Sequence, residues 1–543
     1  MSGSRCLNGN VCCNRNQRAC WRKKPAESRP QPGLAAPPNR RFGLSVILLL
    51  AAVVPLRAAI EGPLRVESGV LTGTTDLSSG VSAYKGIPFA APPVGALRWR
   101  APEPPAKWEG VRQATKFSAV CMQTPYAEGS PYRTQAEPLS EDCLYLNIWT
   151  AAHSAAERRP VMVWIYGGAL TRGSASLPPY NGAELAKKGV VLVSFNYRLG
   201  VFGFFAHPEL TAESAHHSSG NYGFLDQIAA LQWVQRNIAQ FGGDPNRVTI
   251  FGESAGSWSV NLLVASPLAK GLFQRAIGES GANFAPMAKL ADMEAGGLRA
   301  AKSLGADSLA ALRTKPAEEI LRANGEAAAN VDGWVLPAEV RAIFAAGKQN
   351  DVPILIGSNA DEGTAFASRV STMAALEASA RRYGDRAGAF LKLYPADSDE
   401  QARAAQAAAI RDQFFGWEMR TWARMQTKTG KSKTNLYYFG RVPPGPGSEF
   451  LGAYHSAEIV YAFHNLDITS RPWDEVDRKL GDVISSYWVT FAATGDPNGK
   501  GLPAWRVYSA QSERVMGLGN RIEPLDIPHK AALDFFDEWF APR

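Results

Sequence analysis

Ser254 lies at the centre of an unbroken strand–turn–helix pattern. The apolar run VTIF begins at Val248, the small-residue turn GESAG spans Gly252 to Gly256, and the helix-compatible segment SWSVNLLVAS ends at Ser266. The turn matches the pattern G-x-S-x-G, in which small residues let the backbone turn sharply and hold the serine hydroxyl clear of the sheet, above the helix N-terminus. The segment therefore predicts a buried strand, a tight turn and a helix, with Ser254 as a candidate nucleophile.

Other short apolar runs predict further buried strands. Runs that are apolar on both faces are typical of a parallel sheet covered by helices on both sides. The periodic segment 224–241 predicts a helix that ends at FGGDPN, and the Ala-, Leu-, Glu- and Arg-rich region from about 287 to 429 predicts helices inserted over the sheet. We therefore predict one α/β domain over residues 60–543, with a mostly parallel sheet, helices on both faces and a helical insertion over the active site. The predicted strands are Leu144–Trp149, Val161–Tyr166, Val190–Tyr197, Val248–Gly252, Val352–Gly357 and Leu436–Val442.

The candidate base for Ser254 is a histidine. A serine hydroxyl becomes a useful nucleophile when a base accepts its proton and an acid orients that base. In α/β-hydrolases the acid and then the histidine follow the serine along the chain, which leaves His455, His464 and His529. His455 is favoured because it lies in the loop-like segment GAYHSAE after a predicted strand. His464 lies in an apolar helical pattern, and His529 lies near the end of the chain.

The candidate acids follow another predicted strand. VPILIG runs into SNADEGTAF, which places Asp361 and Glu362 just beyond the C-terminal end of that strand. Ligands and catalytic groups gather at this edge of an α/β sheet. Position alone does not distinguish the two carboxylates.

Two small-residue turns are candidates for an oxyanion hole, a pair of backbone N–H groups that stabilise negative charge in the transition state. The turn Tyr166–Ala169 follows the predicted strand VMVWIY, and Ala255 directly follows the candidate nucleophile. Losing one such donor typically lowers turnover by about 100- to 1,000-fold.

The charge of the chain is concentrated at its start. The formal net charge is +8, but residues 1–59 carry ten Lys or Arg and a single acid, while residues 60–543 carry 48 basic and 49 acidic side chains. Because the predicted domain is close to neutral, we predict no nucleic-acid partner.

The first 59 residues are predicted to lie outside the folded domain. Residues 1–39 are polar and rich in Arg and Pro without apolar periodicity, which predicts disorder. The pair Arg40–Arg41 precedes the 15 uncharged residues Phe42–Leu56, and small residues follow. This pattern is typical of a secretory signal, because a spanning helix needs about 20 apolar residues. We expect an exported protein, periplasmic or secreted; the alternatives are an uncleaved membrane anchor over residues 42–56 and a buried helix.

Two of the six cysteines, Cys121 and Cys143, fall in the predicted domain. A disulfide across their separation of 22 positions would contribute about 3 kcal/mol of stability in an oxidising compartment. Two buried free thiols are the alternative.

The residues as a whole resemble the type B carboxylesterase and cholinesterase family of α/β-hydrolases, over nearly all of residues 63–543. The resemblance is carried by five ordered stretches: YKGIPFAAPPVGALRW (Tyr84–Trp99), EDCLYLNIW (Glu141–Trp149), VMVWIYGGA (Val161–Ala169), NYRLGVFGF (Asn196–Phe204) and the long block from Gly220 to Gly256. It implies a triad of Ser254, Glu362 and His455. It also implies an oxyanion hole from Gly168, Ala169 and Ala255, and a disulfide between Cys121 and Cys143.

Two departures from the family pattern bear on the substrate. Ala169 replaces the third glycine of the oxyanion turn, which keeps the N–H but adds a methyl group. The segment between the two cysteines contains no Trp, whereas cholinesterases place their choline-stacking Trp there, so a quaternary ammonium site is unsupported. A general, bacterial-type carboxylesterase is therefore favoured over a cholinesterase.

The expected reaction is hydrolysis of a small-molecule ester through an acyl-enzyme, which needs no metal or organic cofactor. Arg172, three residues after Ala169, is a candidate for binding an anionic acyl group. The alternatives are a catalytically inactive relative used for binding, and a triad hydrolase acting on an amide, thioester or lactone.

Overall fold

The computed structural model describes residue 60 and residues 62–126, 128, 132, 137–322, 327–368 and 371–541. The leader and the apolar segment 42–56 lie outside these residues. Within the described residues, none of the helices has the length and apolar character needed to cross a membrane.

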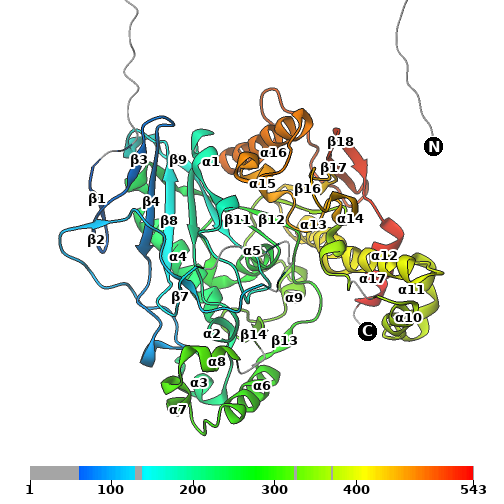
Figure 1. Cartoon of the computed structure of the whole chain (residues 1–543), viewed down its shortest axis with the longest axis horizontal. Helices are drawn as coiled ribbons and strands as arrows, with labels where there is room; N and C mark the ends of the chain where they lie inside the picture. The colour runs from blue at the N-terminus through cyan, green and yellow to red at the C-terminus, as the bar shows by residue number, and fades with distance from the viewer. Residues whose placement is uncertain are drawn as a thin grey trace, which may run out of the picture. The chain divides into compact units, whose positions relative to one another are not determined.

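A mixed sheet of eleven strands forms the centre of the fold (Figure 1). Its seven central strands, from β10 to β17, run parallel, and the edge strands pair antiparallel. The predicted mostly parallel sheet is thereby confirmed. In spatial order the strands are β3 (Thr74–Asp76), β4 (Val81–Pro88), β8 (Tyr145–Thr150), β10 (Val191–Phe195), β9 (Arg159–Ile165), β11 (Gly243–Glu253), β12 (Arg275–Glu279), β15 (Ile354–Asn359), β16 (Thr434–Phe439), β17 (Arg514–Leu518) and β18 (Ile522–Asp526).

Three small ladders lie outside this sheet. Their strands are β1 (Leu64–Val66), β2 (Gly69–Thr72) and β5 (Val111–Gln113); β6 (Val120–Cys121) and β7 (Leu139–Ser140); and β13 (Ala288–Lys289) and β14 (Asn330–Val331).

All six apolar runs predicted as strands are strands of the large sheet, with ends that differ by a few residues. The largest difference is β11, which begins at Gly243 rather than Val248. Gly243 pairs with Arg159, and a register shift separates this pair from the regular ladder that starts at Val248. The glycines of FGGDPN therefore end the preceding helix and also begin an irregular strand.

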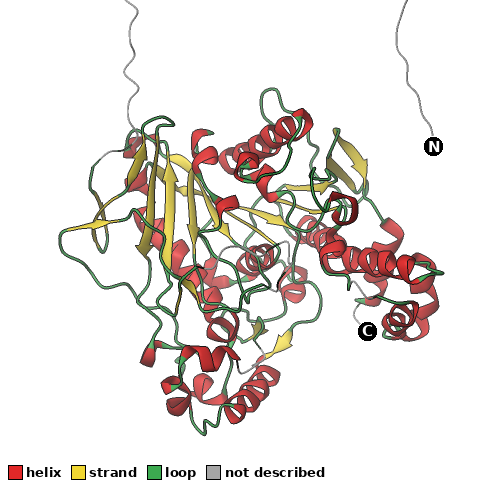
Figure 2. Cartoon of the chain, viewed as in Figure 1, coloured by secondary structure: helices red, strands yellow, loops and turns green. Residues whose placement is uncertain are grey.

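Helices cover both faces of the sheet (Figure 2). The predicted helix over residues 224–241 is α4 (Tyr222–Asn237) continued by the short 3-10 turn Ile238–Phe241, and α5 (Ala255–Ala265) follows Ser254 as predicted. Both pack on β11. The helix α16 (Glu475–Thr494) packs on β9 and β11, and α1 (Ala183–Lys187) packs on β4, β8 and β10. Lys188, which directly follows α1, forms an ion pair with Asp482 of α16. The remaining short helices of this part are α2 (Gly200–Phe204), α3 (Pro208–Glu213), α14 (Ser448–Leu451), α15 (Ile459–Ala462) and α17 (Lys530–Trp539).

The helix-rich region 287–429 forms two groups that β15 separates. In Figure 1 the helices α6, α7 and α8 of the first group lie with α3, whereas its last helix, α9, packs on α5 and α13; the second group lies beside α17. The first comprises α6 (Leu290–Ser303), α7 (Leu309–Thr314), α8 (Ala317–Arg322) and α9 (Val340–Ala345). The second comprises α10 (Met373–Arg381), α11 (Ala387–Leu393), α12 (Asp399–Ile410), the π-helix η8 (Arg411–Gly416) and α13 (Trp417–Thr429).

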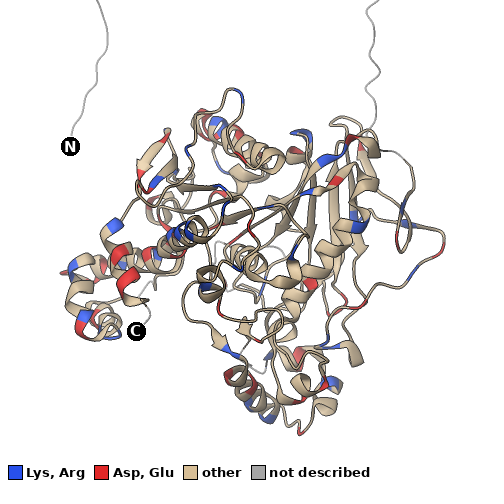
Figure 3. Ribbon diagram, turned by 180° about the vertical axis from the view of Figure 1, so that it is seen from behind, with Lys and Arg blue, Asp and Glu red and all other residues tan. Residues whose placement is uncertain are grey.

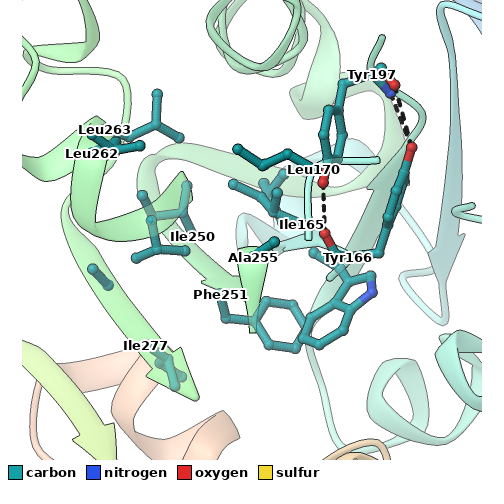
Figure 4. Packing of buried hydrophobic residues seen from close by; sticks show 14 of the residues in the cluster. Ile165, Tyr166, Leu170, Tyr197, Ile250, Phe251, Ala255, Leu262, Leu263 and Ile277 are labelled. Carbon is teal, nitrogen blue, oxygen red and sulfur yellow. Dashed lines mark hydrogen bonds between the residues drawn. The ribbon is translucent and has the colours of Figure 1, made fainter. Parts of the chain in front are cut away.

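Aromatic and aliphatic side chains fill the centre of the sheet beside Ser254. Figure 4 shows Ile165, Phe251 and Ala255 packed together near Tyr166 and Tyr197. The two tyrosine rings stack 4.6 Å apart, and the Tyr197 hydroxyl donates to the Tyr166 carbonyl at 2.8 Å. Burying a large apolar side chain contributes about 1.5 to 3 kcal/mol, so the strand ends around Ser254 rest on a well-packed core.

Basic and acidic residues are interspersed over the fold (Figure 3). Arg198 and Asp226 form a buried pair with hydrogen bonds of 2.8 and 2.7 Å between the guanidinium and the carboxylate. Breaking such a buried pair typically costs about 3 to 5 kcal/mol. Asp226 lies on α4, so the pair joins that helix to the chain after β10.

Candidate active site

Ser254 occupies the sharp turn that its sequence predicts. β11 ends at Glu253, α5 begins at Ala255, and Ser254 between them has φ 57° and ψ −125°. A left-handed serine costs of order 1 to 3 kcal/mol and marks a constrained position. Gly256 is required by close packing, because a Cβ there would lie 1.9 Å from the carbonyl oxygen of Ile165. Ser254 is partly exposed, whereas both of its neighbours are buried.

The structure brings His455 and Glu362 together. Nδ1 of His455 lies 2.6 Å from Oε2 of Glu362, and both side chains are buried. Glu362 opens the 3-10 turn Glu362–Ala365 after β15, and its Oε1 accepts the N–H of Asn359 at 2.7 Å. Asp361, the other candidate acid, instead accepts the N–H of Ala453 at 2.8 Å. Its carboxylate therefore holds the loop that carries His455.

The other two candidate histidines lie elsewhere. His529 shares a 3.2 Å hydrogen bond with the Tyr438 hydroxyl. His464 follows α15 and lines a surface groove with Glu184 and Arg478.

Nε2 of His455 lies 3.1 Å from Oε1 of Glu253, the residue before the candidate nucleophile. The Ser456 hydroxyl donates to the same oxygen at 2.6 Å. Within the described part of the chain, no hydrogen bond joins Ser254 Oγ to His455. Sequence reasoning missed Glu253, although its place inside the GESAG turn was the available signal.

Buried carboxylates set the electrostatics around His455. Burial lowers the pKa of His455, but the charges of Glu253 and Glu362 outweigh it, and the net pKa is raised above 6.5. Burial also raises the pKa of Glu253 to about 7 and that of Glu279 to about 8. Burial together with the neighbouring carboxylates raises the pKa of Glu458 well above its usual range.

The turn after β9 has an unusual backbone. Gly168, Ala169 and Leu170 have φ of 103°, 56° and 58°, so three consecutive residues are left-handed and two of them are not glycine. Gly168 is required, since a Cβ there would lie 2.1 Å from the Arg172 carbonyl oxygen. Among the described residues, the N–H groups of Gly168, Ala169 and Ala255 donate to no acceptor. Ala255 is the first residue of α5, where the helix itself offers its N–H no partner.

Aromatic rings surround His455. Ring centroids of Phe415, Phe366 and Tyr132 lie 4.8, 5.0 and 6.5 Å from the imidazole, and the Tyr132 hydroxyl donates to the His455 carbonyl at 3.0 Å. Phe366 is 49% exposed. Sequence reasoning missed Phe366 and Phe415. Phe366 lies four residues after Glu362, but Phe415 comes from the π-helix, for which the sequence has no periodic signal.

Cys121 and Cys143 form a disulfide, as the resemblance implied. Within the segment that it closes, Tyr126 lies under Arg172, whose guanidinium carbon is 5.0 Å from the ring centroid. Arg172 is half-buried and forms no ion pair with any described carboxylate.

Ser254, Glu362 and His455 follow β11, β15 and β16, so all three lie beyond the C-terminal ends of parallel strands of one sheet. A serine on a strand–helix turn and a paired histidine and carboxylate in this order define the α/β-hydrolase class. Residues 61–536 match the model of the carboxylesterase family, and the chain belongs to that family.

Known proteins similar to this chain are esterases. It is 39% identical to the fumonisin B1 esterase of Sphingopyxis macrogoltabida, over 88% of this chain and 90% of that protein. It is 36% identical to the para-nitrobenzyl esterase of Bacillus subtilis, over 84% of this chain and 94% of that protein. A solved structure of PNB esterase matches with a TM-score of 0.78 at 33% identity, over 89% of this chain and 99% of that one. The chain is therefore a carboxylic ester hydrolase.

Proposed function

We propose that Ser254, His455 and Glu362 form the catalytic triad of this esterase. The observation that carries the proposal is the 2.6 Å contact between His455 Nδ1 and Glu362 Oε2 next to the turn that holds Ser254. This contact places the proton of the neutral imidazole on Nδ1, so that Nε2 can accept a proton once it leaves Glu253. The free N–H groups of Gly168, Ala169 and Ala255 support their assignment as the oxyanion hole.

The reaction proceeds in two acyl-transfer steps. His455 exchanges its Glu253 contact for the Ser254 hydroxyl and accepts its proton as Ser254 Oγ attacks the ester carbonyl. The tetrahedral oxyanion is held by the backbone donors, and the alcohol leaves with the proton from His455. Water, deprotonated by the same imidazole, then attacks the acyl-serine and releases the acid.

The pH dependence tests the assignment of His455 as the base. Because the base must be neutral and its pKa is raised, we expect kcat/KM to rise with pH and to reach half its maximum above pH 6.5. Glu253→Gln removes one of the charges that raise the pKa of His455, so the midpoint should move to lower pH. We expect Glu418→Gln to leave the midpoint unchanged, since Glu418 is a buried carboxylate that bonds Phe284 and Ala285 instead. An unchanged or higher midpoint in Glu253→Gln would contradict the assignment.

We further propose that the preferred substrates carry a carboxylate on the acyl group, bound by Arg172. The support is a half-buried guanidinium without an ion-pair partner among the described residues, four residues after Gly168 and stacked on Tyr126. An arginine without a partner suits a planar carboxylate, which it can bind through two hydrogen bonds.

Arg172→Ala should raise KM for a monocarboxylated aryl ester by about 10-fold and change KM for its neutral isostere by less than about 2-fold, because only the former loses a charge-assisted hydrogen bond. Steady-state kinetics on the ester pair measure this. Arg382→Ala is the matched control, since Arg382, which directly follows α10, also lies over a tyrosine ring, with its guanidinium carbon 5.1 Å from the centroid of Tyr383. Equal losses on both esters would reject the carboxylate site.

Residues 1–59 are proposed to direct export, and residues 60–543 to form the catalytic domain. The support is the basic, apolar and small-residue pattern around Phe42–Leu56, together with a disulfide that needs an oxidising compartment. N-terminal sequencing of the protein recovered from the medium or periplasm tests this. A start near residue 60 supports a cleaved signal, and retention in the membrane fraction with residues 42–56 intact would indicate an anchor.

A further inference from the structure

The left-handed turn at Gly168–Leu170 is held at both ends by hydrogen bonds. Just before the turn, Tyr166 is fixed by the stacked Tyr197, whose hydroxyl donates to the Tyr166 carbonyl (Figure 4). At the last residue of the turn, the Leu170 carbonyl accepts the N–H of Gly200 at 2.7 Å. Three residues beyond the turn, Gly173 is fixed by Gln123. Because left-handed non-glycine residues are strained, such a turn keeps its shape only when the surroundings hold it.

The side chain of Gln123 forms two hydrogen bonds with the backbone of Gly173. Its Oε1 accepts the Gly173 N–H at 2.8 Å, and its Nε2 donates to the Gly173 carbonyl at 2.9 Å. Nε2 also donates to the carbonyl of Cys121 at 3.0 Å, which ties the amide to the disulfide. The Gln123 side chain therefore pairs with both the N–H and the carbonyl of Gly173.

A second contact reaches the same stretch from the other end of the disulfide-closed segment. The Glu137 carboxylate accepts the Ser174 hydroxyl at 2.9 Å, and it also accepts the Ser176 hydroxyl. Residues 173–176 are thus held by side chains close to both cysteines. The disulfide covalently links the segments that carry Gln123 and Glu137.

Backbone hydrogen bonds connect the residues just before Gly173 to the proposed oxyanion hole. The N–H groups of Thr171 and Arg172 both donate to the Gly168 carbonyl at 3.1 Å, so Gly168 is tied to the residue directly before Gly173. The peptide plane of that carbonyl carries the N–H of Ala169. A shift at Gly173 therefore rotates a donor of the proposed oxyanion hole.

We propose that Gln123 is a positioning residue for ester hydrolysis, which sets the place of the Gly168 and Ala169 N–H groups through its two hydrogen bonds to Gly173. The inference rests on the proposed oxyanion hole. Gln123 contacts no reacting atom, and it acts through the turn. Since the donors matter most in the transition state, its loss should lower kcat more than it raises KM.

The test compares two substitutions of Gln123. Gln123→Met keeps the length of the side chain without either hydrogen bond, and Gln123→Ala removes the side chain. We expect both to lower kcat for p-nitrophenyl butyrate by about 10- to 100-fold, since a misplacement of about 1 Å costs of this order, with KM within about 3-fold. The inhibition constant of an aryl trifluoromethyl ketone, which forms a tetrahedral adduct with the serine, should rise by the same factor as kcat/KM falls.

Gln235 supplies the matched control. Its Nε2 also donates to two backbone carbonyls, those of Pro245 and Leu272, at 2.8 and 2.9 Å, but on α4. Gln235→Met should lower the melting temperature without changing kcat or the inhibition constant. Near-normal kcat in Gln123→Met, or an equal loss of kcat in Gln235→Met, would overturn the positioning role. Should Gln123→Ala fail to fold, Gln123→Met carries the same comparison. Failure of the proposed function is distinguishable, because it would leave Ser254→Ala active whatever Gln123 does.

Discussion

Replacement of Ser254 by alanine is expected to lower kcat for p-nitrophenyl butyrate hydrolysis by about 10⁵- to 10⁶-fold. Removing the nucleophile of a serine triad abolishes the covalent route and leaves only the rate that the oxyanion hole and substrate binding supply. Among the described residues the Ser254 side chain forms no hydrogen bond, and its strained backbone is held by the bond from its N–H to the Glu279 carbonyl at 2.8 Å. The variant should therefore stay folded while its activity disappears.

Ser259→Ala is the matched control for that experiment. Ser259 lies on the same helix, α5, and its hydroxyl donates to the Ala255 carbonyl at 2.9 Å. Its loss should cost stability and leave kcat within about 3-fold, as expected for a neutral hydrogen bond away from the reaction. Activity of Ser254→Ala within 10-fold of the parent protein, with both variants folded, would contradict the assignment of the nucleophile.

Replacement of His455 by alanine should have an effect of the same order, about 10⁵- to 10⁶-fold in kcat, because without its base the hydroxyl of Ser254 is a poor nucleophile. Steady-state hydrolysis of p-nitrophenyl butyrate measures the loss. His455 is buried between two carboxyl groups, so the variant also leaves Glu253 and Glu362 without the imidazole that they contact. Circular dichroism and thermal melting should accompany the kinetics.

His464→Ala distinguishes the base from a histidine nearby in the chain. His464 lies nine residues later in a surface groove, away from the turn that holds Ser254. We expect kcat of this variant to stay within about 2-fold. A large loss of kcat in His464→Ala together with a small loss in His455→Ala would identify His464 as the base and reject the proposed triad.

The strands and the serine turn could be predicted because their signals are local. Continuous apolar runs mark buried parallel strands, and GESAG needs glycine at position 256, where the Ile165 carbonyl leaves no room for a side chain. No local signal in the sequence distinguishes Asp361 from Glu362 as the acid that pairs with His455. The two carboxylates are adjacent in the chain, and only the path of the loop around Ala453 decides which one faces His455.

The parts that the sequence did not reveal come from long-range contacts. Phe415 reaches His455 because a π-helix interrupts the 3.6-residue period between α12 and α13, and hydrophobic periodicity carries no signal for that insertion. Gln123 meets Gly173 across 50 residues of sequence, and its amide has no pattern that separates it from a solvated glutamine. For Glu253, the only signal in the sequence was its position directly before Ser254.

Two kinds of side chain surround the proposed active site. Phe366 and Phe415 place apolar rings at His455, whereas Arg172 and Tyr126 place a cation and a polar ring beside the proposed oxyanion turn. Apolar rings suit the hydrocarbon part of an ester, and the guanidinium suits an anionic group. The kinetics of Arg172→Ala therefore report on substrate choice without disturbing the triad.

The central claim is that Ser254 is the nucleophile of this esterase. Treatment of the full-length protein with a fluorophosphonate, followed by peptide mapping in a mass spectrometer, tests it most directly, since such reagents phosphonylate an activated serine. We predict a single adduct on the peptide that contains Ser254, together with complete loss of esterase activity and no labelling of Ser254→Ala. Full inactivation with the adduct on another residue, or an active enzyme that takes up no label, would contradict the claim.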